Sequence, residues 1–132
     1  MDLVIYDDGG GIHIKLDRVD DSIVFATHEA IHTHPDFESL THVIIDMLDV
    51  SRMDLSVAAV REVARRDAAM VSKNPELRLA LVAHADVIRG MSNVYRSQAE
   101  ATNIEKSWEA RYCESLAEAS EWLSASANTS DN

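Results

Sequence analysis

Apolar and polar residues along the chain follow two different periods, which predict strands that alternate with helices. Residues Ile12–Asp17 alternate between apolar and polar side chains, a pattern typical of a strand with one buried face. The apolar runs Val43–Leu48 and Leu77–Ala83 are nearly continuous, as in the strands of a parallel sheet that is covered on both faces. With an apolar run at the start of the chain and an alternating segment near its end, the pattern predicts strands over residues 3–6, 12–17, 43–48, 77–83 and 108–112.

Between these strands lie segments with the three- to four-residue period of amphipathic helices. Asp20-Asp21-Ser22 provides capping side chains for the first helix, and Asp54-Leu55-Ser56 opens the second, with Asp54 expected as its cap. The turn residues Asp7-Asp8-Gly9-Gly10-Gly11 predict a hairpin between the first two strands. Helices are expected over residues 23–33, from 54–56 to 72, 86–101 and 114–123.

The resulting order, β-β-α-β-α-β-α-β-α, predicts a single α/β domain. Strands that alternate with helices through short connections form right-handed crossovers, and therefore a mostly parallel sheet with helices packed on it. The opening hairpin adds an antiparallel strand, which makes the sheet mixed. We expect the domain to span residues 1–123 and the small polar residues 124–132 to form a flexible tail.

Composition limits the classes of partner and compartment. The chain has 132 residues and a formal charge of −11, with 46% hydrophobic residues, as in a soluble globular domain. The negative charge opposes binding to nucleic acids or to an anionic membrane surface, and no apolar run has the roughly 20 residues that a membrane span needs. The single cysteine, Cys113, cannot form an internal disulfide, which fits a reducing compartment. We therefore expect a cytoplasmic protein that binds neither nucleic acid nor membrane.

The segment His28-Glu29-Ala30-Ile31-His32 matches the HExxH pattern of zinc metallohydrolases. Histidines four residues apart on a helix can hold one zinc ion, with the glutamate as general base. The apolar face of this helix, however, is centred on Ile23, Thr27 and Ile31, which places both histidines on a flank that leans toward solvent. We therefore predict neither a catalytic nor a structural metal, and a metallohydrolase is the least favoured function.

Other polar residues near the predicted strands have simple interpretations. Asp46, Asp49 and Asp54 follow the central strand and could together hold Mg²⁺, because ligands of open α/β sheets bind at this edge. The simpler interpretation makes Asp54 a helix cap and the other acids loop or packing residues. His13 lies on the polar face of its strand and is expected to be solvated. No cofactor is predicted.

The stretch from Ile44 to Ser56 carries a family resemblance. An apolar strand is followed by Asp49, an apolar residue, Ser51, a variable residue, an apolar residue and Asp54 before a helix. In this spacing, and in the order of its elements, the chain resembles the STAS domain, the fold of anti-sigma factor antagonists of the SpoIIAA type. Segments that are similar to small stand-alone bacterial proteins of this kind extend the resemblance over about residues 2–123; they are Leu79–Ala83, Arg89–Tyr95 and Leu116–Leu123.

The resemblance implies a non-enzymatic regulatory module that binds another protein or a second copy of itself. In the family, a partner kinase phosphorylates the first serine after the second aspartate, but here that position is Leu55, which has no hydroxyl group. We therefore predict partner binding that is constitutive with respect to phosphorylation at this position, and we expect Ser56 to bind backbone amides of the helix. The residues assigned to partner binding are Asp49, Ser51, Arg52, Met53, Asp54 and Ser56.

Two alternatives stay open beside the interaction module. A carrier of a small or lipid-like ligand would need a pocket between the helices and the sheet, with convergent polar groups. A zinc hydrolase would use His28, Glu29 and His32, and would carry a stoichiometric metal ion.

Overall fold

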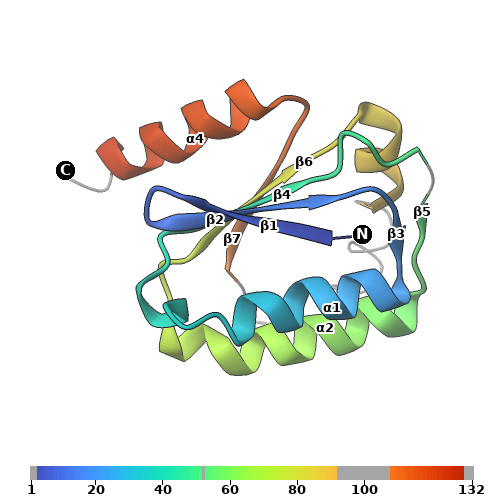
Figure 1. Ribbon diagram of the computed structural model, residues 1–132, viewed down its shortest axis with the longest axis horizontal. Helices are drawn as coiled ribbons and strands as arrows, with labels where there is room; N and C mark the ends of the chain where they lie inside the picture. The colour runs from blue at the N-terminus through green and yellow to red at the C-terminus, as the bar shows by residue number, and fades with distance from the viewer. Residues whose placement is uncertain (1–2, 52, 92–107, 130–132) are drawn as a thin grey trace.

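Five strands form one mixed sheet in the computed structural model, which describes residues 3–51, 53–91 and 108–129 (Figure 1). The strand order is β1-β2-β4-β6-β7. β1 and β2 are antiparallel, whereas β2, β4, β6 and β7 pair in parallel. The strands are β1 (Leu3–Asp8), β2 (Gly11–Leu16), β4 (His42–Asp46), β6 (Arg78–Val82) and β7 (Glu109–Cys113). The mixed, mostly parallel α/β fold predicted from the sequence is confirmed.

Helices cover both faces of this sheet (Figure 1). Two helices, α1 (Asp21–His32) and α2 (Val57–Met70), lie side by side on one face, and α4 (Leu116–Thr129) lies on the other. Residues 85–91 form a further helix after β6. The short elements are β3 (Val19–Asp20), η1 (Phe37–Ser39), β5 (Met53–Asp54) and η2 (Val71–Lys73).

The hairpin between β1 and β2 turns at Gly9 and Gly10, as the sequence predicts. Their φ angles are 53° and 91°, in the region that L residues with side chains rarely adopt. A two-residue hairpin loop with both central φ angles positive matches the twist of the flanking strands. The adjacent glycines therefore fix the register that sets Ile5 opposite Ile14.

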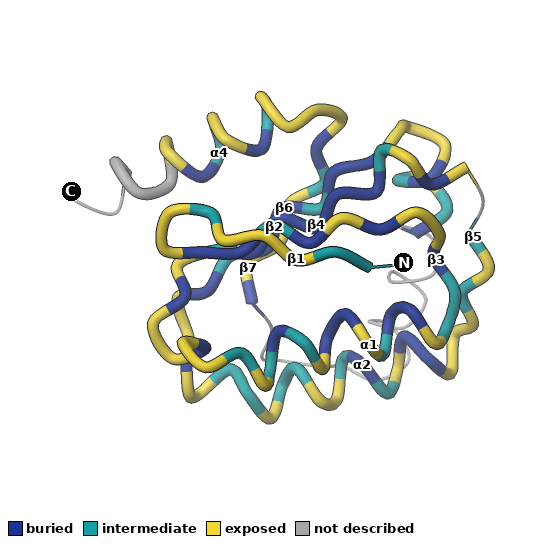
Figure 2. Tube along the Cα trace, viewed as in Figure 1, coloured by how far each residue is buried: buried dark blue, intermediate teal, exposed yellow. Residues whose placement is uncertain are grey.

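The described residues form two apolar cores, one on each face of the sheet. Figure 2 shows the buried positions along the strands and the helices. The smaller core, under α4, joins Ile44, Ala80, Val82, Cys113, Ala119 and Leu123. The larger one lies under α1 and α2 and includes Ile12, Ile14, Ile23, Ile31, Val43, Ile45, Val63, Leu79, Val87 and Met91. Alternate residues of β4 and β6 enter the two cores, which explains the nearly continuous apolar runs of these strands. The prediction that they are neighbouring, buried, parallel strands is confirmed.

Several boundaries differ from the sequence-based expectation. The second helix begins at Val57, with Ser56 as its cap, so the expected capping role of Asp54 is wrong. Asp54 instead belongs to β5, which pairs in parallel with β3 in a small second sheet. The last helix continues to Thr129, six residues beyond the expected end, because serine and alanine extend it. The expected helix over residues 86–101 is described from residue 85 to 91, and its remainder lies outside the described residues.

The two isoleucines that face each other across the hairpin should differ sharply in their contribution to stability. Ile14 is fully buried, whereas Ile5 on the edge strand is 42% exposed. We expect Ile14→Ala to lower the free energy of unfolding by about 2–5 kcal/mol, because it leaves a cavity under α1. Ile5→Ala should cost less than about 1 kcal/mol. Urea unfolding of both variants measures the difference, and equal losses would contradict the placement of β2 inside the sheet.

Candidate functional site

The predicted partner-binding loop connects β4 to α2 and lies largely at the surface. Asp49, Ser51, Asp54 and Ser56 are exposed, as a contact surface requires. Met53 is half-buried and packs against the larger core. Arg52 lies outside the described residues, so its expected exposure stays a prediction.

Pairing of β3 with β5 brings the beginnings of α1 and α2 together. Asp20 lies opposite Asp54 in this small sheet, and the side chain of Asp20 caps α1 by accepting a 2.9 Å hydrogen bond from the backbone amide of Ile23. Ser56 caps α2, because its Oγ accepts a 3.1 Å hydrogen bond from the backbone amide of Ala59. The prediction that Ser56 binds a backbone amide of the helix is therefore confirmed.

A second set of contacts links the two helix beginnings directly. The carboxylate of Asp21, in the first turn of α1, accepts hydrogen bonds from both the backbone amide and the hydroxyl group of Ser56, each at 2.8 Å. The Ser56 hydroxyl therefore donates to one helix and accepts from the other. Its donor proton and an acceptor lone pair are both used within the fold.

An open groove lies between these two helix beginnings. It has a volume of about 330 Å³ and is lined by Asp20, Asp21, Ser22, Asp54, Leu55 and Ser56. The backbone amide of Ile23 and the hydroxyl group of Ser22 donate to Asp20 and lower the pKa of this carboxyl group. Three carboxylates with one half-buried leucine give the groove an anionic rim and a small apolar contact. Chemically, it can receive a cationic side chain with an apolar stem.

The three carboxylates near the end of β4 do not form one cation site. Asp46 is buried, with 5% of its surface exposed; its Oδ2 accepts from His13 Nε2 at 3.0 Å and its Oδ1 from the amide of Leu48 at 3.1 Å. Asp49 pairs instead with Lys15 at 3.2 Å. Asp46 is thus a packing residue, as the simpler interpretation held. The expectation that His13 is solvated is wrong, because this acceptor holds it half-buried.

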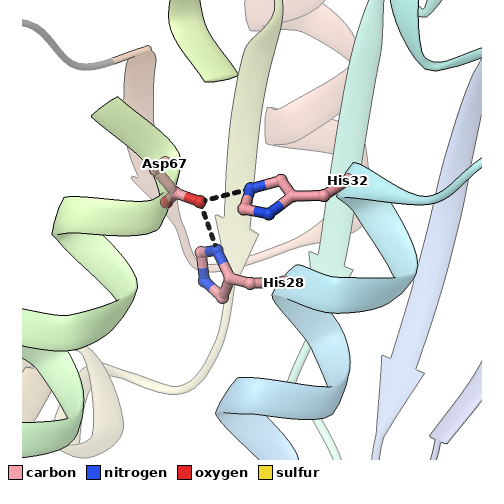
Figure 3. Close-up of side chains that lie close together, drawn as sticks. All are labelled: His28, His32 and Asp67. Carbon is pink, nitrogen blue, oxygen red and sulfur yellow. Dashed lines mark hydrogen bonds and ion pairs between the residues drawn. The ribbon is translucent and has the colours of Figure 1, made fainter. Parts of the chain in front are cut away.

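The two histidines of the HExxH segment meet an aspartate of the neighbouring helix (Figure 3). His28 Nδ1 and His32 Nε2 both donate to Asp67 Oδ1, at 2.9 and 2.8 Å. The three side chains are 10%, 13% and 15% exposed. The cluster of His28, His32 and Asp67, hereafter the His–Asp cluster, therefore links α1 to α2 in a largely desolvated position.

This arrangement corrects the expectation that both histidines lean toward solvent. The apolar pattern of α1 defines only the face toward the sheet, whereas α2 covers the flank on which the histidines lie. Asp67 was missed, although a signal for it exists. It follows the buried residues Val60 and Val63 at spacings of seven and four, so an acid occupies the apolar stripe of α2.

The surroundings of the His–Asp cluster keep the aspartate ionised. Burial raises the pKa of Asp67, but hydrogen bonds and charge interactions with His28 and His32 outweigh this effect and leave the pKa below its ordinary value. The ring of His32 also contacts Phe37 and Trp108, with ring centroids 6.2 and 5.9 Å apart. The cluster thus combines an ionised oxygen ligand with two imidazoles beside aromatic rings. Such a donor set can hold a divalent transition metal.

The interior gap between α1 and the sheet is small. Its volume is about 20 Å³, and Thr27, His28, Met47 and Met91 are among the residues that line it. A space of this size holds about one water molecule. It does not favour the alternative of a carrier with a ligand between helices and sheet.

The strand order and the two helical layers define the class of fold, a mixed five-stranded α/β domain. A solved structure is similar over nearly the whole chain: an uncharacterized protein from the DUF3478 family with a SpoIIAA-like fold, from Shewanella loihica PV-4. The TM-score is 0.50 and the sequence identity 14%, over 92% of this chain and 91% of that chain. The chain therefore has a SpoIIAA-like fold, as the resemblance implied.

At this level of identity the likeness concerns the fold alone. No protein-family model matches the chain, and no curated protein matches it in sequence. In the part of the chain that the structure describes, no helix has both the length and the apolar character to cross a membrane.

Removing the shared acceptor of the His–Asp cluster should destabilise the fold. Asp67→Ala leaves two largely buried imidazole N–H groups without their acceptor, and we expect a loss of about 1–3 kcal/mol in the free energy of unfolding. Asp67→Asn should lose less, because its amide oxygen still accepts a hydrogen bond. Chemical unfolding at neutral pH measures both.

The matched control for this prediction is Glu29→Ala. Glu29 is on α1 between the two histidines but is exposed, so its removal should change stability by no more than about 0.5 kcal/mol. If Asp67→Ala unfolds at the same denaturant concentration as Glu29→Ala, the His–Asp cluster contributes nothing to the packing of α1 on α2.

Proposed function

We propose that this chain is a non-enzymatic protein-interaction module that acts in the cytoplasm and docks its partner at the beginnings of α1 and α2. The observation that carries the proposal is the groove between these helices, together with the exposed loop before α2. The sequence-assigned residues Asp54 and Ser56 line this groove, and Asp49 and Ser51 lie exposed on the loop.

The chemistry of the groove favours a basic partner over a second copy of the chain. Asp20, Asp21 and Asp54 line it, and the whole chain carries a formal charge of −11. Two acidic surfaces repel one another, whereas a partner with lysine or arginine is attracted over several ångströms and is oriented as it approaches. Leu55 supplies the apolar contact between the carboxylates.

The local contacts of Ser56 support binding that does not depend on phosphorylation. Leu55 occupies the position of the family's phosphoacceptor and has no hydroxyl group. The neighbouring hydroxyl of Ser56 is bonded to Asp21 on one side and to the amide of Ala59 on the other. A phosphate on Ser56 would place nearly two negative charges beside Asp21 and break the link between the two helices. We therefore propose that the surface is permanently competent to bind.

Reversing one charge in the groove should abolish partner capture. Asp54 is exposed, and its backbone alone makes the β3–β5 pairing, so Asp54→Lys keeps the fold while it repels a basic partner. We expect affinity capture from the native cell, quantified by mass spectrometry, to recover the partner with the wild type. The amount of partner captured should be at least about ten-fold lower with Asp54→Lys.

The matched control is Glu121→Lys, which makes the same charge change on an exposed residue of α4. It should capture as much partner as the wild type, and both variants should keep the melting temperature. If Asp54→Lys captures the partner undiminished, the groove is not the interface.

Phosphatase treatment should leave partner capture unchanged. The protein isolated from its native cell should carry an unmodified Ser56 peptide, because the hydroxyl is engaged in the fold. Peptide mass spectrometry before and after phosphatase checks this. The proposal of phosphorylation-independent binding would be overturned if Ser56 carries stoichiometric phosphate and if removal of this phosphate restores or abolishes partner capture.

A further inference from the structure

We propose that His28, His32 and Asp67 form a binding site for one divalent transition metal ion, zinc above all, which joins α1 to α2. The apolar pattern of α1 predicts histidines that lean toward solvent and hold no metal, but in the structure both histidines turn toward a carboxylate (Figure 3). The proposal stands apart from the docking groove, which lies at the beginnings of the same helices.

The ligand atoms already converge. His28 Nδ1, His32 Nε2 and a carboxylate oxygen of Asp67 all lie within 4.8 Å of one another, on the described part of the chain. Zinc binds nitrogen and oxygen ligands at about 2.0–2.2 Å, so tetrahedral ligand atoms are roughly 3.3 Å apart. The two contacts to Asp67 Oδ1, at 2.9 and 2.8 Å, would need to widen by only about half an ångström. The two ligand nitrogens, which lie within 4.8 Å of each other, would need to approach to roughly 3.3 Å.

Metal binding would replace the two hydrogen bonds to Asp67 with coordination bonds. In the metal-bound form each imidazole carries its proton on the ring nitrogen that is not a ligand, and the ligand nitrogen offers its lone pair to the metal. The carboxylate of Asp67 is already ionised, so the occupied site carries one net positive charge. Three protein ligands leave a fourth position for water.

The donor set and its surroundings select the kind of ion. Two imidazoles with one carboxylate suit zinc and its neighbours in the first transition series, whereas Mg²⁺ and Ca²⁺ prefer oxygen ligands alone. The ligands project from two packed helices, and the ring of His32 lies against Phe37 and Trp108, so little freedom is lost on binding. Ions can reach the site, because His32 also lines an open surface hollow of about 320 Å³.

The geometry supports a stabilising ion and not the metallohydrolase alternative. Glu29, the expected general base of the HExxH pattern, is exposed and lies outside the His–Asp cluster. A metal here would therefore strengthen the contact between α1 and α2 at the position where two hydrogen bonds to Asp67 Oδ1 join the helices.

Two variants can remove the metal ligands while they keep the hydrogen bonds. In His28→Asn the side-chain amide nitrogen takes the place of Nδ1, and in His32→Gln it takes the place of Nε2. Either amide can still donate to Asp67, but neither binds zinc. His84→Gln is the matched control, because His84 is exposed and outside the cluster.

The experiment titrates untagged, chelator-stripped protein with zinc chloride in competition with a chromophoric chelator. We expect one zinc ion per chain for the wild type and for His84→Gln, and affinity at least about 100-fold weaker for each ligand variant. At a hundred-fold excess of zinc over Kd, the melting temperature should rise by roughly 10 °C in the first two proteins only. Absence of zinc binding by the wild type, or equal affinity in all four proteins, would overturn the proposal.

A second measurement tests the assigned zinc ligands even if a ligand variant does not fold. Long-range ¹H–¹⁵N spectra of the wild type report the state of each imidazole nitrogen. Zinc should shift His28 Nδ1 and His32 Nε2 and leave both nitrogens of His84 unchanged. A shift confined to other histidines would show adventitious binding and contradict the assigned site.

Discussion

The parallel pairing of β2, β4 and β6 determines where α1 and α2 lie. Each parallel pair needs a crossover connection, and right-handed crossovers from β2 to β4 and from β4 to β6 place α1 and α2 on the same face. The two helices therefore run in the same direction, side by side (Figure 1). Both features of functional interest follow from this arrangement.

Different polar groups need hydrogen-bond partners at the two ends of the α1–α2 pair. At their beginnings, the unpaired amide groups of both helices must find acceptors, and Asp20, Asp21 and Ser56 provide them. This requirement concentrates carboxylates around an open groove. Further along the helices, His28 and His32 become desolvated and need an acceptor, which Asp67 provides. The side chains that satisfy these amide and imidazole groups thus form one surface suited to a cationic partner and one cluster suited to a metal ion.

Much of the fold could be predicted from the chain because its signals are local. The apolar runs of β4 and β6 require cover on both faces, and adjacent glycines mark the hairpin. The cap at Asp20 is also a local signal. The family resemblance in residues 44–56 identified the SpoIIAA-like fold, which the solved Shewanella loihica structure shares.

The contacts between elements could not be predicted in the same way. The pairing of β3 with β5 involves two short segments far apart in the chain, and it moves the helix cap from Asp54 to Ser56. The surroundings of His28 depend on α2, which a helical wheel of α1 alone does not contain. An aspartate in the apolar stripe of α2 was the one available hint, because a buried acid requires a partner.

The central claim is that the beginnings of α1 and α2 form the partner-binding surface. Photo-crosslinking in the native cell tests it most directly, with the reactive amino acid placed at Ser51 in one protein and at Glu121 on α4 in another; both positions are exposed. The account predicts a discrete cross-linked protein of basic character from position 51 and none from position 121. A cross-link from position 121 with none from position 51 would contradict the account, because the partner would then bind the opposite face of the sheet.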